Sequence, residues 1–501
     1  MVVQHNMQAA NANRMLNVTT SAQSKSTEKL SSGYRINRAA DDAAGLTISE
    51  KMRKQIRGLD QASTNAQDGV SSVQTAEGAL TEVHSMLQRM NELATQAANG
   101  TNSKDSDRQA IQDEIDQLTT EIDRVSETTK FNETYLLKGE DGTKTINMKA
   151  HDAGLKGKLT DNGDGTATFV MDTLNAGDKV SIGGKSYTIG SDDAEVEKWF
   201  TENGNDVKDQ ATKKVTVNGT EYTYYAEKKA NTTPGSLTDG WHAGWYASEP
   251  TDKGDGNGTA LSGKFANVDA IKAEVKKGAT VQNGTKSVTG MNDTTPKDGV
   301  SDTDATVISK NKAYELASKE LLKANQIGDT EGNAQVGTGA NVDVAVDLTH
   351  GDGTFSIKVG QAKVANSLAF SLHVGADADM TNKIQVNIDA MDSASLGIKG
   401  LNVKDDSGNA ATYAVDAISD AISKVSSQRS ALGAVQNRLE HTINNLDNVV
   451  ENTTTAESRI RDTDMAEEMV NYSKNNILAQ AGQSMLAQAN QSNQGVLSLL
   501  Q

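Results

Sequence analysis

The sequence predicts a mainly α-helical protein with a β-rich insertion, in which both chain ends form one long antiparallel helical bundle. Apolar residues recur every seven positions from Leu59 to Ala97, and again from Ile418 to Val450. Heptads sustained over five or six repeats indicate helices that need partner helices along their length. All three prolines and all three tryptophans lie between these two segments. The middle is therefore predicted to form one or more β-rich surface domains.

Composition narrows the class of protein. The 501 residues are 36% hydrophobic and 4% aromatic, which disfavours one large compact core and favours burial along extended helices. The net charge of −18 argues against nucleic acid as a partner, because nucleic-acid affinity depends on Lys and Arg. The chain has no cysteine, which fits an external protein that needs no disulfide.

Two further properties bear on location. No segment reaches the roughly 18 apolar residues that a membrane-spanning helix needs, so no membrane partner is expected. Residues 1–13 contain no apolar core of a secretory signal peptide. We therefore expect either a cytosolic protein or one that is exported by a route that does not require a cleaved signal peptide.

Three helices are expected in the N-terminal part. A weakly patterned helix over about 4–29 is interrupted at Gly33, and a long helix follows over about 46–98 before Gly100, a residue type that commonly ends helices. Ser106–Gln109 is predicted to form a capping box at the start of the third helix. The short turn predicts that the last two helices lie antiparallel. The apolar face of the third helix carries Ile111, Ile115, Leu118, Ile122 and Val125.

Strand signals begin after this helix. Phe131–Leu137 is predicted to be a small non-helical closure. Alternating runs flank Gly183-Gly184 and Asn218-Gly219, and such dipeptides between alternating strands predict two-residue hairpins. Asp164–Thr166 and Asp352–Thr354 each lead into another strand-like run.

Helical order returns toward the C-terminus. One helix is expected near 313–324, a strand over Ile384–Ile388, and continuous helix by Val415. The last helix is predicted to start at about Asp464. The apolar tail Val496–Leu500 would be exposed in a monomer, which indicates a partner surface.

The sequence carries no motif for catalysis or metal binding. The seven histidines include no pair four apart, which the zinc-peptidase motif His-Glu-x-x-His requires. Asp161–Gly165 superficially resembles a calcium loop, but Gly163 and Gly165 occupy ligand positions and Thr166 the position of the required glycine. We therefore expect a turn there, and a protein without catalytic residues, cofactor or metal.

Both chain ends carry specific sequence motifs. They are Leu30–Asn37 with Asp41–Leu46, Gln67–Val70, Ala76–Leu80, Gln88–Leu93, Asn475–Gly482 and Leu486–Leu500. These motifs resemble those of bacterial flagellins, and the first is similar to the flagellin signature at the junction of the inner and outer filament cores. The resemblance covers about 1–140 and 366–501, and the middle shows none.

The resemblance implies a structural subunit that self-assembles into the flagellar filament for swimming motility. In that family the terminal helices are largely disordered in the monomer and form the inner core only in the filament. The chain is exported unfolded by the flagellar type III system. The implied location is the extracellular flagellum, and the implied partners are further copies of the chain, an export chaperone and the filament cap.

The resemblance and the shift in composition together divide the chain into five parts. Residues 1–45 are assigned to the N-terminal inner-core helix with its connecting spoke, and 463–501 to the C-terminal inner-core helix. Residues 46–140 and 366–462 are assigned to the two halves of the outer-core helical domain. Residues 141–365 are assigned to a variable, surface-exposed β-rich region.

Two sets of candidate site residues follow from the resemblance. Arg89, Leu93 and Glu114 match positions that contribute to recognition by Toll-like receptor 5, although Asn91 and Thr95 depart from the best-recognised pattern. Locally, Arg89 and Glu114 are solvated helix charges, and Leu93 lies near the heptad strip without being part of it. The candidate inner-core and chaperone contacts are Ile477, Leu478, Met485, Val496, Leu497, Leu499 and Leu500.

Small residues occupy several heptad positions of the long helix. Ala62, Ala66, Gly69 and Ala76 could be ordinary core, but we expect them to permit the close helix approach that filament packing demands. In either case their role is structural.

Two alternative functions remain at this point. A hook–filament junction protein has similar ends, but more often carries a proline after the paired aspartates, where this chain has Ala43-Ala44. A non-flagellar adhesin with a coiled-coil stalk would not carry the paired terminal signatures. Seeded polymerisation of purified monomer distinguishes the three.

Overall fold

The chain folds into two units, each built from segments that are distant in sequence. Unit 1 comprises Met1–Thr75, Ala369–Asn387 and Ser430–Gln501, and unit 2 comprises Ala76–Leu368 and Ile388–Arg429. No helix among the described residues is long and apolar enough to cross a membrane. The computed structural model describes residues 6–99, 101, 106–203, 213–228, 241–250, 264–294, 297–338, 353–405 and 408–499.

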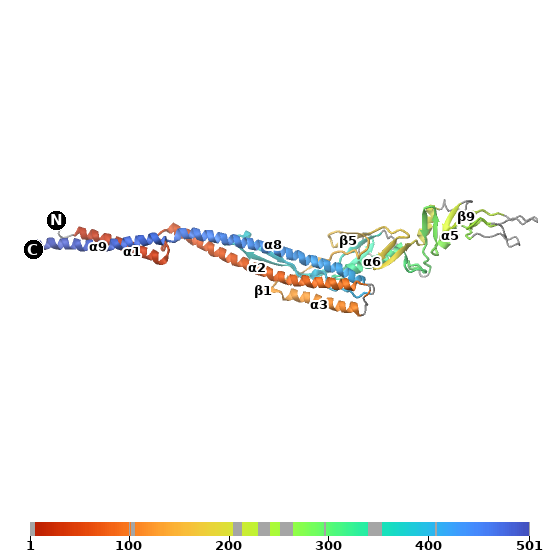
Figure 1. The fold of residues 1–501 in the computed structure, drawn as a ribbon, viewed down its shortest axis with the longest axis horizontal. Helices are drawn as coiled ribbons and strands as arrows, with labels where there is room; N and C mark the ends of the chain where they lie inside the picture. Colours follow the sequence, from red (N-terminus) through yellow and green to blue (C-terminus); the bar gives the residue numbers. More distant parts are fainter. Residues whose placement is uncertain are drawn as a thin grey trace, which may run out of the picture. The chain divides into compact units, whose positions relative to one another are not determined.

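Two long helices, α2 (Ala43–Ala97) and α8 (Asn409–Arg461), bring the two halves of the sequence together. They lie side by side (Figure 1) and run antiparallel, since Ser63 of α2 donates a hydrogen bond to Asp447 of α8 at 3.1 Å. Their heptad positions are buried, which confirms the predicted bundle. Burying a Leu or Val side chain contributes about 1.5–3 kcal/mol. The buried positions are Leu59, Ala66, Val73, Leu80, Leu87 and Ala94 of α2, and Ile418, Val425, Leu432, Leu439 and Leu446 of α8.

The small heptad residues belong to the core of the chain itself. In unit 1, a Cβ atom added at Gly69 would lie 2.2 Å from Leu372 Cδ1 and 3.3 Å from Leu439 Cδ1. Leu372 comes from a two-stranded sheet of β17 (Leu368–His373) and β18 (Lys383–Ile388), joined through the 3₁₀ helix η2 (Met380–Asn382). Ala62, Ala66 and Ala76 are buried as well, so within the chain these residues are core, and their role in filament packing stays a prediction.

Unit 1 also contains the terminal helices α1 (Met7–Ser32) and α9 (Met465–Leu499). Gly33 ends α1 in the left-handed conformation, with φ 78°, which a residue without a Cβ adopts at no steric cost. The carboxylate of Asp464 caps α9 by accepting from the amide groups of Ala466 and Glu467, at 2.9 and 3.1 Å. Both predicted boundaries are confirmed.

In unit 2, α3 (Asp107–Thr128) folds back beside α2. Its buried face includes Ile111, Ile115 and Ile122, as predicted. The predicted capping box does not form: the Ser106 hydroxyl donates to Asp107 Oδ1 at 3.1 Å. Ser106 has helical dihedral angles (φ −118°, ψ −58°), whereas a capping side chain needs an extended backbone to reach the first amides of the helix. A small hairpin of β1 (Lys130–Phe131) and β2 (Thr134–Tyr135) follows, and α7 (Ser393–Leu396) packs against α3.

The middle of the chain contains two hydrophobic cores. The first is built on Phe169, Phe355, Tyr314 and Leu321. Two sheets contribute residues to this core, one with the strand order β14-β15-β5-β4 and one with the order β13-β7-β6. The predicted helix near 313–324 is confirmed as α6. The elements are β4 (Gly157–Asp161), β5 (Thr166–Met171), β6 (Lys179–Ile182), β7 (Lys185–Gly190), β13 (Val307–Ser309), α6 (Lys310–Asn325), β14 (Gln335–Thr338) and β15 (Thr354–Lys358), with β3 (Glu140–Asn147) paired to β16 (Gln361–Asn366) nearby.

The second core is built on Phe200, Trp245, Ile271 and Val281. Its sheet has the order β10-β9-β8-β11-β12. The two helices that contribute to this core, α4 and α5, are not predicted from the sequence. The elements are α4 (Asp193–Asn203), β8 (Lys214–Val217), β9 (Thr220–Tyr225), β10 (Gly244–Tyr246), α5 (Val268–Val275), β11 (Thr280–Asn283) and β12 (Lys286–Thr289).

The predicted turns form between the predicted strands. Gly183 and Gly184 have φ of 56° and 69°, and Asn218 and Gly219 have φ of 47° and 79°, the positive values that a two-residue hairpin turn requires. The segment that superficially resembles a calcium loop is the turn between β4 and β5, where Asp164 accepts from the Thr166 amide at 3.0 Å. Asp352 lies outside the described residues.

Candidate assembly surface

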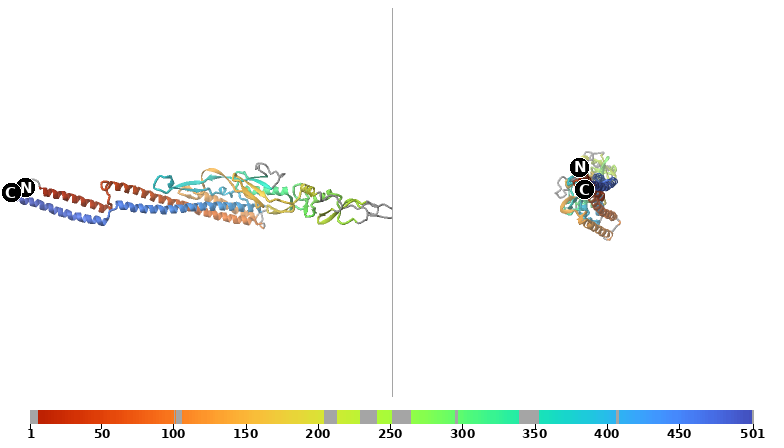
Figure 2. Two further views of the ribbon diagram at one scale, coloured as in Figure 1. Left: turned by 90° about the horizontal axis from the view of Figure 1, so that it is seen from above. Right: turned by 90° about the vertical axis from the view of Figure 1, so that its left-hand side faces the viewer.

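The terminal helices α1 and α9 pair through a seam of mostly small and polar residues. They are antiparallel, because Asn6 donates to the Ala489 carbonyl at 3.2 Å while Lys29 lies 3.8 Å from Glu468. Figure 2 shows the two helices side by side. The less exposed positions recur with the alternating three- and four-residue spacing of a two-helix contact. The positions with this spacing are Ala9, Ala12, Leu16, Thr19, Gln23 and Ser26 in α1, and Glu468, Tyr472, Asn475, Ala479, Gly482, Leu486 and Ala489 in α9, and a few others such as Ala22 and Asn476 are half-buried beside them.

Apart from Leu16, Tyr472 and Leu486, the larger apolar side chains of both helices lie away from this seam. Ile477 and Val470 are each 67% exposed, and Met7 is 74% exposed. A stable amphipathic helix normally turns its large apolar residues toward its partner. The exposed apolar side chains lie at several angles around the two helices, and together they are called the outward apolar face. They are Met7, Met15 and Val18 of α1, and Met465, Met469, Val470, Ile477, Leu478 and Met485 of α9. Such a surface is typical of a protein contact.

Three of the predicted contact residues belong to this face: Ile477, Leu478 and Met485. The side chains of Val496, Leu497 and Leu499, and the whole of Leu500, lie outside the described residues. Sequence reasoning missed the other six members of the face. The sequence spacing could have indicated two of these six, Met7 and Val18, because Val18 follows Met7 by eleven residues and so lies on the same side of the helix.

The junction between the terminal and the long helices is held by backbone contacts. The Arg35 amide donates to the Arg461 carbonyl at 2.7 Å, and the Thr463 amide donates to the Gly33 carbonyl at 3.0 Å. Ile36 is buried there. A Cβ atom at Gly45 would lie 2.8 Å from Ile36 Cδ1. The motifs Leu30–Asn37 and Asp41–Leu46 therefore have a direct structural role: they close the turn between α1 and α2.

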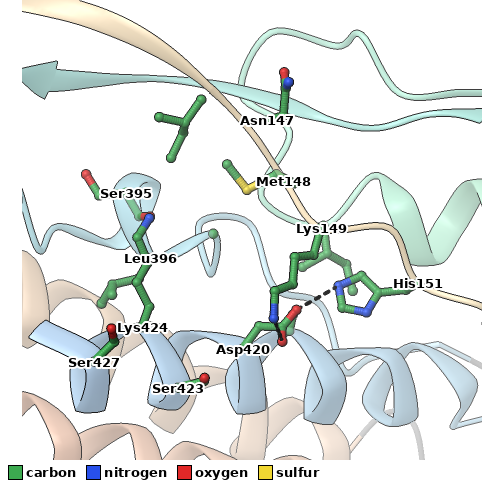
Figure 3. Close-up of a pocket in the computed structure, with 14 residues that line it drawn as sticks. Asn147, Met148, Lys149, His151, Ser395, Leu396, Asp420, Ser423, Lys424 and Ser427 are labelled. Carbon is green, nitrogen blue, oxygen red and sulfur yellow. Dashed lines mark hydrogen bonds and ion pairs between the residues drawn. The ribbon is translucent and has the colours of Figure 1, made fainter. Parts of the chain in front are cut away.

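Unit 2 contains a pocket of about 370 Å³ beside α8 (Figure 3). Lys149 Nζ lies 2.8 Å from Asp420 Oδ1, and His151 Nε2 lies 3.8 Å from Asp420 Oδ2. Lys424 Nζ donates to the Ser395 carbonyl at 2.5 Å, and burial lowers the pKa of Lys424. Asp420 and Lys424 thus attach the segment after β3 and the α7 turn to α8.

Comparison with known proteins identifies the family to which the chain belongs. The model of the bacterial flagellin N-terminal helical region matches residues 3–141, and that of the C-terminal helical region matches residues 415–500. A flagellin of Clostridium tyrobutyricum is 36% identical over 99% of this chain and 100% of its own length. The chain belongs to the bacterial flagellin family. Flagellin C of Vibrio anguillarum is 34% identical over 99% of both chains, and flagellin of Bacillus subtilis (strain 168) is 33% identical over 100% of both.

A flagellin is a structural protein, and this chain is a subunit that self-assembles into the bacterial flagellar filament for motility. Its relatives match over essentially their whole length, the β-rich middle included. These full-length matches favour flagellin over the hook–filament junction protein and the coiled-coil adhesin that the sequence left open.

The candidate receptor residues of this flagellin lie where α2 meets α3 in unit 2. Arg89 Nε of α2 lies 2.9 Å from Glu114 Oε1 of α3, and both side chains are about half exposed. Leu93 is only 2% exposed. It lies one turn from Arg89 on the side of α2 from which Arg89 reaches Glu114 of α3. Leu93 is therefore part of the core, not merely a neighbour of the heptad strip.

Proposed function

We propose that this flagellin polymerises by ordering α1 and α9 against the same helices of neighbouring copies. The outward apolar face supports the proposal. In the isolated chain this face contacts water. Its burial against neighbouring copies would stabilise the contact by about 25 cal/mol for each Å² of apolar surface removed from water. Because a seam of small and polar residues gives the pair little stability of its own, the helices would become ordered as they join the filament.

The test is seeded elongation, in which fragments of filaments made from the unchanged chain are extended by purified monomer. Ile477→Asp and Met485→Asp would place a carboxylate in the new contact. We expect elongation to fall at least about tenfold, since an unpaired buried charge costs several kcal/mol. Val170→Asp is the matched control, because Val170 is an exposed apolar residue of the β-rich middle. Normal elongation by both α9 variants would refute the proposal.

We further propose that the chain leaves the cell unfolded through the flagellar type III channel and assembles outside, with an export chaperone and the filament cap as partners. The described terminal and long helices contain no proline, and the chain contains no cysteine, which suits passage through a narrow channel. The C-terminal segment with Val496, Leu497, Leu499 and Leu500 would bind the chaperone and then join the inner core. Deleting residues 496–501 should abolish filament growth, and normal filaments from that variant would contradict this role.

The five-part division of the chain remains our proposal for the filament. Residues 1–45 and 463–501 would form its inner core, 46–140 and 366–462 its outer core, and 141–365 its outer surface. Because the chain has no cysteine, single cysteines can report access to a maleimide dye. Thr173→Cys should react in monomer and filament alike. Ile477→Cys should react only in the monomer, and equal labelling of Ile477→Cys in both states would oppose the division.

Recognition by Toll-like receptor 5 is a second candidate function, supported by the exposed Arg89–Glu114 pair. Arg89 and Glu114 would contact the receptor, while Leu93 would support them from beneath. Purified monomer can be titrated against the receptor ectodomain. We expect Arg89→Ala and Glu114→Ala to weaken binding, and Arg124→Ala, an exposed position of α3 paired within its own helix, to leave it unchanged. Absence of binding by the unchanged monomer at micromolar concentration would refute receptor recognition.

A further inference from the structure

Arg461, the last residue of α8, contacts two other segments of unit 1. Its guanidinium carbon lies 4.7 Å from the centre of the Tyr34 ring, directly after α1. Its terminal nitrogen NH1 lies 2.9 Å from Glu50 Oε1 in α2. Its side chain is only 14% exposed although its partner Glu50 is exposed. One residue thus joins the end of α1, the first turns of α2 and the end of α8.

Only arginine among the basic residues suits this position. A planar guanidinium can stack on an aromatic face and donate to a carboxylate in its own plane at the same time, whereas a lysine ammonium is a point charge on a flexible stem. The backbone supports this geometry, because the Arg461 carbonyl accepts from the Arg35 amide at 2.7 Å and the Arg35 guanidinium donates to the Ile460 carbonyl at 2.6 Å.

The position of Arg461 along the chain determines what this contact controls. Tyr34 follows the residue that ends α1, and Asp464, which caps α9, comes three residues after Arg461. Fixing Tyr34 against Arg461 therefore fixes where α1 and α9 begin to run beside each other. Between small side chains, a shift by one turn would bring similar residues together, so the seam by itself specifies its register weakly.

We propose that Arg461 is a positioning residue for filament assembly: stacked on Tyr34 and paired with Glu50, it sets the register in which α1 and α9 become ordered. This inference rests on the proposed role of the two helices in polymerisation. A subunit without the contact would present its outward apolar face in mixed registers, and most of its encounters with the filament end would be unproductive.

The register can be measured directly with a disulfide. A Cβ atom at Gly482 would lie 3.9 Å from Leu16 Cβ, which matches the separation of a disulfide. The double variant Leu16→Cys/Gly482→Cys, polymerised and then oxidised, should form an internal crosslink that migrates as a single chain on a denaturing gel. Leu16→Cys/Ala479→Cys reports a register shifted by about one turn.

Arg461→Met in these backgrounds should lower the Leu16–Gly482 crosslink at least threefold and raise the shifted one. Arg459→Met, two residues away on the exposed side of α8, is the matched control and should leave both yields unchanged. Equal crosslink yields in Arg461→Met and in the unchanged background would overturn the proposal.

Elongation gives a second, independent readout. Arg461→Met and Tyr34→Leu should each slow seeded elongation about fivefold, the size expected for losing a partly desolvated cation–π contact. The double substitution should slow it little further, because both remove the same contact. Tyr34→Phe should elongate normally, and Arg461→Lys should be slowed although it keeps the charge. Normal elongation by Arg461→Met, or independent effects of the two substitutions, would refute the inference.

The controls separate this inference from the function on which it rests. If the unchanged chain does not extend seeds, the proposed role in polymerisation fails. If the unchanged chain and Arg459→Met extend seeds while Arg461→Met does not, the positioning role is supported, provided that Arg461→Met monomer keeps the urea midpoint of the unchanged chain. A lowered midpoint would instead assign Arg461 to stability alone and overturn the proposal.

Discussion

At the scale of single residues, unit 2 depends on a few buried polar side chains that join distant segments. Arg108 of α3 is 3% exposed. Its Nε atom donates to the Ala97 carbonyl at the end of α2, at 3.0 Å, and its NH1 atom donates to the Asp405 carbonyl at 2.7 Å. Carbonyls at a helix end have no partner within the helix. Arg108 therefore caps α2 and holds the segment that precedes α8.

Replacing Arg108 by methionine should destabilise unit 2 strongly. Arg108→Met leaves two inward-facing carbonyls without their donor, and we expect the free energy of unfolding to fall by about 2–4 kcal/mol. Urea denaturation followed by circular dichroism measures the change. Arg124→Met is the control on the same helix: Arg124 is exposed and pairs only with Glu121, so its loss should cost about 0.5 kcal/mol or less. Equal effects of the two substitutions would contradict the capping role.

Replacing each of two glycines of α2 by alanine should change the stability of the protein in opposite directions. In a helix, Gly→Ala normally stabilises by up to about 1 kcal/mol. Gly78 should show that gain, because a Cβ atom there would meet nothing within 4 Å. At Gly58 the added Cβ would lie 2.9 Å from Ala376 Cβ and 3.1 Å from Ala376 Cα, so we expect a loss of about 1–3 kcal/mol from overpacking. Thermal unfolding of the two variants tests the difference, and a gain at both positions would refute it.

Some residues could be interpreted correctly from sequence and others could not. Gly33 and Asp464 end and start helices as predicted, since their effect is local. The burial of Leu93 could not be predicted, because Leu93 lies off the heptad positions that a count within α2 considers. Ser106 carries a capping-box sequence, yet its backbone adopts helical dihedral angles. A local motif shows that a local structure such as a helix cap is possible, and the surrounding packing determines whether it forms.

At the scale of elements, the terminal helices differ from the long ones in what they bury. The α2–α8 bundle buries Leu, Val and Ile at its heptad positions. The α1–α9 seam holds mainly small and polar residues and leaves Met, Val and Ile exposed. Because burial of apolar area is the main favourable term in folding, the long helices form a stable bundle, whereas we propose that the terminal pair depends on further partners.

Adding apolar residues to the seam should order the terminal helices without a partner. Thr19→Leu and Gln23→Leu lie at seam positions, and each buried leucine would contribute about 1.5–3 kcal/mol. The monomer should then show more helix by circular dichroism at 222 nm. Asn17→Leu with Ser24→Leu, at exposed positions of α1, is the matched control and should leave the monomer spectrum unchanged. No gain in helix from the seam pair would argue against a marginal α1–α9 contact.

Element prediction worked best where local chemistry is strong. Asn218-Gly219 and Gly183-Gly184 predict their turns, because positive φ is accessible to few residue types. The short helices α4 and α5 were missed, since each spans few turns and gains its stability from the second core of the middle rather than from a long periodic pattern.

At the scale of the whole molecule, charge opposes assembly. Each copy carries a net charge of −18, and a filament brings many copies together. Salt shortens the range of this repulsion, from about 30 Å at 0.01 M to about 10 Å at 0.1 M ionic strength. The filament contacts must therefore be strong enough to overcome what repulsion remains.

Seeded elongation should consequently accelerate with salt. Between 10 and 100 mM NaCl we expect the rate to rise about tenfold, because screened copies approach the filament end more readily. Sucrose at the same osmolality is the control, since it leaves electrostatic screening unchanged. A rate that stays constant or falls with added NaCl would show that charge repulsion does not limit assembly.

The sequence by itself determined the long heptad helices, the β-rich character of the middle, the main turns and the flagellin resemblance, because each of these follows from local periodicity, composition or motif. Only the tertiary structure decided that Leu372 packs into the space beside Gly69, that Leu93 is buried, that Arg461 joins Tyr34 to Glu50, and which apolar side chains of α9 are left exposed. These features depend on which distant segments meet, and no spacing along one helix specifies that.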